Sequence, residues 1–223
     1  MSSAKVSSEV INEVHEKLNR IYEADPGWKT RGEWPAGVSG SILHPPAAPN
    51  QIAGYEKRLG RALPPTYREF LRLHNGWEHF WGDMTLAGVS GAHTDRVLQK
   101  IDEYVRFKRD ELAGVLGSSF SPADIASWEA ADPRNLYLPN HIAIGTNFGG
   151  VVWLFDTRTH RSDGEMSLVY WTVDYGVWEE RGLEDFPHLL EWASSMADSA
   201  LKRLRDKVKK SATTGRQGKK RER

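Results

Sequence analysis

Apolar residues recur at helical spacing in three segments of the chain, near residues 5–24, 63–76 and 185–204. In each of them, apolar positions lie three or four residues apart with polar residues between them. The first segment shows this most plainly, with Val6, Val10, Val14, Leu18 and Ile21 on one face. These patterns predict amphipathic helices whose apolar faces pack on a core.

Other segments carry short runs rich in Val, Ile, Tyr and Trp, separated by a few turn residues. They are "MTLAGV" (84–89), the two halves of "HIAIGTNFGGVVWLFDTRT" (141–159), "SLVYWTV" (167–173) and "YGVWEE" (175–180). Such spacing favours an antiparallel meander over alternating βαβ units. The sequence therefore predicts an α+β fold, with a mainly antiparallel sheet packed against several helices.

The stretch "LPPTYREFLRLHNG" (63–76) marks both ends of its helix. Proline is tolerated in a first helical turn, and Asn-Gly is a common stop because both residues tolerate positive φ. Pro64, Pro65, Asn75 and Gly76 are therefore interpreted as structural residues.

Three stretches together are similar to the SUKH superfamily, whose domain is of the Smi/Knr type: "IAGYEKRLGRALPPTYREFLRLHNGW", "HIAIGTNFGGVVWLFDTR" and "DFPHLLEWA". The resemblance covers about residues 28–197. It implies the same α+β fold. Bacterial members of the family are predominantly immunity proteins that bind a cognate toxin, often a nuclease, and block it without chemistry of their own. Fungal members act in cell-wall and signalling regulation.

Set against that family pattern, the chain divides into three parts. Residues 1–27 are expected to form an N-terminal helix packed on the body, and residues 28–204 the SUKH-like domain. Residues 92–134 have a polar helical pattern and are interpreted as an insertion in that domain. Residues 205–223 lose apolar periodicity, so the sequence predicts a disordered basic tail.

Charge is unevenly distributed although the formal net charge is 0. Residues 205–223 hold nine basic and two acidic residues, so this segment carries +7 and residues 1–204 carry −7. An acidic body repels nucleic acid and favours a basic partner. Phosphate binding by the basic tail remains an alternative, although the tail lacks the aromatic residues that stack on single strands.

Candidate catalytic and metal-binding patterns do not assemble into a recognised motif. The chain has no cysteine, its eight histidines include no HExxH pair, and "GTNFGG" lacks the Lys-Ser/Thr ending of a phosphate loop. We therefore expect no catalytic residue, no metal site and no cofactor, and hence no enzyme. The N-terminus lacks a secretory h-region and no run is apolar enough to span a membrane, which indicates a cytoplasmic protein without a membrane partner.

Two segments mix tryptophan with carboxylates next to predicted element ends, "WEHFWGDM" (77–84) and "VDYGVWEE" (173–180). Aromatic anchors ringed by charges are typical of protein interfaces. The expected toxin-binding surface comprises Trp77, Glu78, Trp81, Asp83, Asp174, Tyr175 and Trp178. The alternative is that the aromatic residues of the first segment close the core. The expected function is neutralisation of a basic toxin domain by occlusion. A regulatory or scaffolding role of the fungal type is the alternative.

Overall fold

The computed structural model describes residues 6–25, 40–177 and 183–218, with side chains described as far as residue 209. The helices are α1 (Ser8–Ala24), α2 (Pro49–Leu59), α3 (Pro65–Leu73), α4 (Ala92–Leu116), α5 (Pro122–Ala131) and α6 (Phe186–Gly218), with short 3-10 turns at Leu138–Asn140 and Thr157–Thr159. The strands are β1 (Ile42–Leu43), β2 (Trp77–Trp81), β3 (Met84–Leu86), β4 (Ile142–Thr146), β5 (Val151–Phe155), β6 (Leu168–Thr172) and β7 (Gly176–Val177).

All seven strands form one sheet in which spatial order follows chain order and every neighbouring pair is antiparallel. The meander expected from the spacing of the apolar runs is confirmed, and so is the α+β class. No helix in the described part of the chain is both long enough and apolar enough to cross a membrane.

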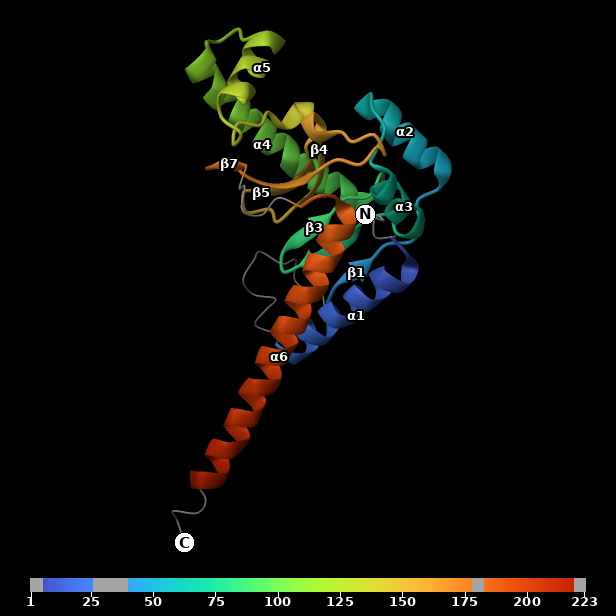
Figure 1. Ribbon diagram of the computed structural model, residues 1–223, viewed down its shortest axis with the longest axis vertical. Coiled ribbons are helices and arrows are strands. Elements are labelled where there is room, and N and C mark those ends of the chain that lie inside the picture. Colours follow the sequence, from blue (N-terminus) through green and yellow to red (C-terminus); the bar gives the residue numbers. More distant parts are fainter. Residues whose placement is uncertain (1–5, 26–39, 178–182, 219–223) are drawn as a thin grey trace.

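Helices cover both faces of this sheet (Figure 1). In β5, Val151, Trp153 and Phe155 belong to the larger core, beneath α1, α2, α3 and α6. Val152 and Leu154 point the other way, into a second core beneath α4. All five residues of β5 are buried because side chains alternate between two covered faces.

Helix α1 begins at the N-cap Ser7, whose side chain accepts a hydrogen bond from the Val10 N–H. Its buried residues Ile11, Val14, Leu18 and Ile21 form the stripe that packs along α6. Figure 1 shows the two helices side by side, although they lie at opposite ends of the sequence.

Helix α3 has the boundaries that its sequence suggests. Pro65 occupies the first helical position, and Gly76 adopts φ +101° just beyond the helix. Asn75 fixes the chain just after the C-terminal end of α3, because its Oδ1 accepts a hydrogen bond from the Val89 N–H. The structural interpretation of these residues is confirmed. The cap at the other end comes from a distant residue: the Glu165 carboxylate accepts hydrogen bonds from Thr66 N–H and Oγ1, both at 2.8 Å.

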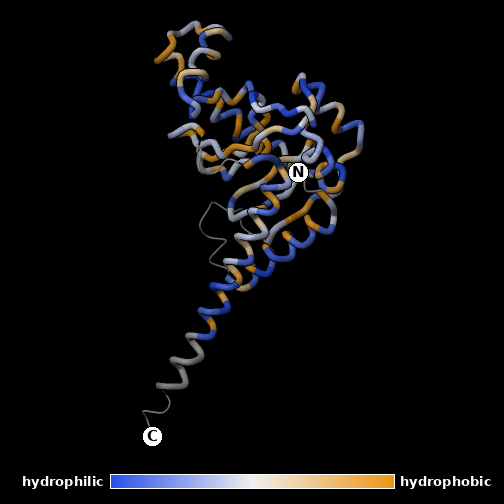
Figure 2. Tube along the Cα trace, viewed as in Figure 1, coloured by the Kyte–Doolittle hydropathy of each residue, from blue (hydrophilic) through white to orange (hydrophobic). Residues whose placement is uncertain are grey.

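The segment expected to be an insertion forms α4 and α5, and α4 provides the cover for the second face of the sheet. The C-terminal segment differs from expectation. Helix α6 continues to Gly218, through most of the segment for which the sequence predicted disorder. Arg and Lys, which are good helix formers, make up four of the six residues at 205–210 and favour continuation of the helix there, whereas Thr213, Thr214 and Gly215 do not. The helix extends away from the body (Figure 1), and its described outer part is largely hydrophilic (Figure 2).

Candidate functional site

Three hairpin tips share one end of the sheet. In an antiparallel meander every second turn lies at the same end, so the turns β2–β3, β4–β5 and β6–β7 are neighbours. The register shows this directly, since Thr85 pairs with Thr146 and Val151 pairs with Thr172. We call this end the hairpin edge; its tips are residues 82–83, 147–150 and 173–175.

Two pockets lie at the hairpin edge. The aromatic pocket has a volume of about 410 Å³ and is lined by Trp81, Asp83, Met84, Asn147, Trp153, Tyr170, Trp192 and Met196. The insertion cleft, of about 690 Å³, lies between the β6–β7 hairpin and the segment of α4 and α5. Its lining includes Lys108, Trp128, Trp171, Asp174 and Tyr175.

Both pockets contain a carboxylate beside tryptophan rings. In the insertion cleft, Lys108 pairs with Glu111 and Arg134 pairs with Asp132, whereas Asp174 is exposed and forms no ion pair within the described part of the chain. Asp83 likewise has no cationic partner among the described residues. The β2–β3 and β6–β7 turns are four strand spacings apart, so the two carboxylates stand about 19 Å from one another along the edge. The edge therefore presents two negative charges set among aromatic rings.

The predicted surface residues do not all lie together. Trp81 and Asp83 line the aromatic pocket, and Asp174 and Tyr175 line the insertion cleft. Tyr175 is 76% exposed, which suits a contact residue. Trp178 lies outside the described residues. The structure thus brings four of the seven residues to one edge.

Trp77 is not a surface residue, and its assignment to the binding surface is wrong. It is fully buried and packs against Phe70 and Phe80 in the larger core. Its indole N–H donates to Ser41 Oγ. The alternative interpretation, in which the aromatic residues of this segment close the core, holds for Trp77 and Phe80.

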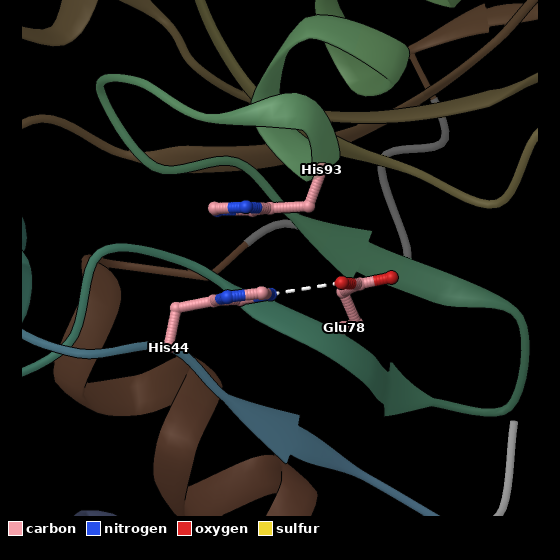
Figure 3. A group of neighbouring side chains, drawn as sticks. All are labelled: His44, Glu78 and His93. Atoms are coloured by element: carbon pink, nitrogen blue, oxygen red, sulfur yellow. Dashed lines mark hydrogen bonds and ion pairs between the residues drawn. The ribbon is translucent and has the colours of Figure 1, made fainter.

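Glu78 is also engaged within the protein, in a group of side chains drawn in Figure 3. His44 Nε2 lies 2.8 Å from Glu78 Oε1, and Arg96 donates to Glu78 Oε2 at 2.6 Å. The His44 and His93 rings are stacked, with centroids 3.5 Å apart and 6° between their planes. His93 Nε2 donates to the Asn75 carbonyl at 2.6 Å. Burial and the neighbouring His44 lower the pKa of His93.

Within the described residues, His44, Glu78 and His93 are the one group whose ligand atoms lie close enough to share a metal ion. A metal ion lies in the plane of each imidazole that binds it, along the nitrogen lone pair. Parallel stacked rings direct their lone pairs side by side, so they do not converge on one ion. In addition, Arg96 forms an ion pair with Glu78, which is the one carboxylate of the group. The geometry favours a structural network of hydrogen bonds and stacked rings that joins the end of β1, β2 and the first turn of α4.

Sequence reasoning missed the far wall of the aromatic pocket. Trp192 and Met196 stand one turn apart on α6, and Trp153 and Tyr170 are cross-strand neighbours on β5 and β6. The available signal was the number of tryptophans, nine in 223 residues, which exceeds the needs of a core. Their convergence depends on how α6 crosses the sheet, which no local pattern encodes.

The fold and its edge define an α+β domain with a helix-covered antiparallel sheet and two open, carboxylate-bearing pockets. The sequence of residues 46–199 matches the SMI1 / KNR4 family (SUKH-1). Because the match covers well over half of the chain, the protein belongs to this family, and the resemblance inferred from its motifs is confirmed. A comparison with individually curated proteins gives no match.

Proposed function

We propose that this protein is an immunity protein that binds a cognate toxin domain through its hairpin edge and neutralises it by occlusion. Family membership supports the class of function. The observation that carries the proposal is the pair of aromatic pockets at one edge, each with a carboxylate that has no cationic partner in the described structure. Aromatic residues in such pockets act as anchors, and carboxylates select for a complementary charge.

The partner we propose is a basic toxin domain in the cytoplasm of the producing cell. Residues 1–204 carry −7, so long-range attraction draws a basic protein towards the body. Lys and Arg that a nuclease uses to hold substrate phosphates are the groups that Asp83 and Asp174 would pair with. Occupation of those groups blocks substrate binding, and the immunity protein contributes no catalytic step.

The experiment is protection of bacteria that express the toxin domain encoded beside this gene. Co-expression of the wild-type protein should restore growth, and the purified pair should form a 1:1 complex by light scattering. The double variant Asp83→Lys/Asp174→Lys should lose protection, because both pockets then repel a basic partner. Asp102→Lys/Asp110→Lys is the matched control, since it makes the same charge change on the exposed surface of α4.

Two results would overturn the proposal. Full protection by the folded Asp83→Lys/Asp174→Lys variant would show that the hairpin edge is not the binding surface. A variant that loses protection while it still binds the toxin at wild-type affinity would indicate a chemical activity in place of occlusion.

A further inference from the structure

Two stacked imidazole rings join the first turn of α4 to the end of β1 (Figure 3). The ring centroids of His44 and His93 are 3.5 Å apart, with 6° between the ring planes. His93 is 7% exposed, and its Nε2 donates a hydrogen bond to the Asn75 carbonyl at 2.6 Å. The Nδ1 of this ring makes no hydrogen bond within the described residues, so it is the atom that takes up a second proton.

The charges around the two rings oppose that second proton. Glu78 supplies the one carboxylate of the group, and both of its oxygens are engaged. His44 Nε2 lies 2.8 Å from Oε1, and Arg96 donates to Oε2 at 2.6 Å. A charged His93 ring would lie near the Arg96 guanidinium and at the positive end of the α4 dipole. Burial and the neighbouring His44 lower the pKa of His93 accordingly.

Other titratable side chains of the surrounding elements do not neutralise this charge. His74, at the end of α3, donates from Nδ1 to the His44 carbonyl at 3.3 Å. His79 of β2 lies near Glu78, and burial lowers the pKa of His79 to about 4. Asp95 of α4 is exposed and forms no ion pair with a described residue. The second proton therefore has no carboxylate of its own.

The stacked rings hold the start of α4 together with the loop that leads into it from β3. Asn75 Oδ1 accepts a hydrogen bond from the Val89 N–H at 2.7 Å, and Thr94 Oγ1 accepts one from the Gly88 N–H at 2.9 Å. Helix α4 covers the second core and supplies Lys108 to the insertion cleft. Release of its first turn would loosen both the cover of that core and one wall of the cleft.

We propose that the His44–His93 stack is an acid-sensitive junction, in which uptake of a proton by His93 separates the rings and releases the first turn of α4. The proton adds a positive charge beside Arg96 and the helix N-terminus, and opening allows water to solvate that charge. His93 binds the proton more weakly in the closed junction than in an open chain. The closed junction is therefore fully stable above about pH 6.5 and becomes less stable as the pH falls below that value. A weaker grip on a toxin in acid rests on the proposed function, whereas the opening itself does not.

The test is hydrogen–deuterium exchange of the full chain at pH 7.5 and pH 5.5, measured by mass spectrometry and corrected for the intrinsic exchange rate. Peptides that cover residues 87–97 should lose protection by up to about tenfold, because pH 5.5 lies one unit below the unfolded pKa of histidine. Peptides that cover β5, which is buried on both faces, should keep their protection. Unchanged protection at residues 87–97, or an equal loss in both segments, would overturn the inference.

Three substitutions assign the response to one ring. His93→Gln cannot take up the proton and retains an N–H for the Asn75 carbonyl, so exchange at residues 87–97 should no longer depend on pH. His160→Gln is the matched control, because His160 is exposed, and it should keep the wild-type response. His79→Asn should keep that response as well, since His79 lies outside the stack. A wild-type response in His93→Gln would show that another group opens the junction.

A further measurement uses the wild-type protein alone, so it stands even if His93→Gln does not fold. In ring-labelled protein, the NMR signal of the His93 imidazole, identified by its contact with the His44 ring, should titrate with a midpoint below about 6.5. A midpoint at or above that value would refute the inference.

Two controls separate this junction from a metal site and from the proposed function. Zn²⁺ added at pH 7.5 should not change the exchange, and zinc-dependent protection of residues 87–97 would make the group a metal site and reject the junction. None of these measurements needs a toxin. A junction that does not respond to acid leaves the proposed function in place, and a failure of toxin protection leaves the junction in place.

Discussion

His79 combines two unusual features at a single position. Its φ is +55°, at the irregularity where β2 shifts register against β3, and its side chain is only 5% exposed. The backbone carbonyl of His79 accepts a hydrogen bond from the Tyr22 hydroxyl at 3.0 Å, which links β2 to α1. Burial lowers the pKa of His79 to about 4. A bulge that turns a polar residue inward leaves no trace in a hydropathy pattern, so the burial of His79 could not be predicted from the sequence.

The low pKa of His79 predicts acid sensitivity. The folded pKa lies below the unfolded value of about 6.5, so the unfolded chain takes up the proton first as the pH falls. His79 therefore does not lower the free energy of unfolding above about pH 6.5, and it lowers that free energy progressively as the pH falls from 6.5 to about 4. Between pH 7.5 and pH 5 the loss from His79 is about 2 kcal/mol.

His79→Asn should remove most of this pH dependence, measured by urea denaturation at several pH values, because asparagine tolerates positive φ and does not titrate. His188→Asn is the control, because His188 should change the pH dependence of stability in the opposite direction. Asp185 raises the pKa of His188, so its stabilisation is present at low pH and disappears as the pH rises through the folded pKa. An unchanged slope in His79→Asn would show that His79 is not the group responsible.

Gly76 is required by geometry as well as by its φ of +101°. A Cβ at this position would lie 2.8 Å from the Gly88 nitrogen and 2.7 Å from His93 Nε2. Gly76→Ala should therefore destabilise the fold by more than about 1 kcal/mol in thermal or urea denaturation. Gly114→Ala in α4, where nothing lies within 4 Å, should stabilise by about 0.5–1 kcal/mol. Equal effects of the two changes would contradict the close approach at Gly76.

At the scale of elements, α4 is essential to the sheet. Val97 is fully buried and packs with Ile101, Val152 and Leu154 in the second core. Val97→Asp buries an unpaired charge there and should cost more than about 3 kcal/mol in free energy of unfolding. Phe107→Asp is the matched control, because Phe107 lies on the same helix but is 56% exposed. A similar loss in both variants would mean that α4 does not cover the sheet as described.

Much of the element pattern was predictable, and the exceptions have physical causes. Strands β3 to β7 and the limits of α3 follow from local spacing and turn chemistry, whereas β1 and β2 were not expected. The role of α4 was not evident, because its stripe is sparse among polar residues and its partner strands come later in the chain. The uninterrupted apolar run Val151–Phe155 was the clue, since a strand that is buried on both sides needs a second cover.

Helix α6 divides into a packed part and a projecting part. Ala197, Ala200 and Leu201 are buried against the core, whereas residues 205–209 are exposed. Truncation after Leu204 should therefore lower the melting temperature by no more than a few degrees, measured by calorimetry. A larger fall would show that the projecting part stabilises the body.

The whole molecule determines how fast the proposed complex forms. The body carries −7, so the association rate with a basic toxin should fall as ionic strength rises past roughly 0.15 M, where the Debye length is about 8 Å. Surface-based kinetics at several salt concentrations provide the measurement. Asp83→Lys/Asp174→Lys should slow association, whereas Trp81→Ala should mainly speed dissociation. A salt-independent rate would show that charge does not guide the encounter.

The helix that projects from the body gives this neutral protein a large permanent dipole moment. Residues 205–223 carry +7, and α6 holds those up to Gly218 away from an acidic body. At a sequence pI of about 7.1 no net repulsion keeps molecules apart near neutral pH. The positive end of one molecule then attracts the acidic body of the next. In dilute buffer this head-to-tail attraction should appear as a negative second virial coefficient, which salt or removal of the projecting segment would abolish.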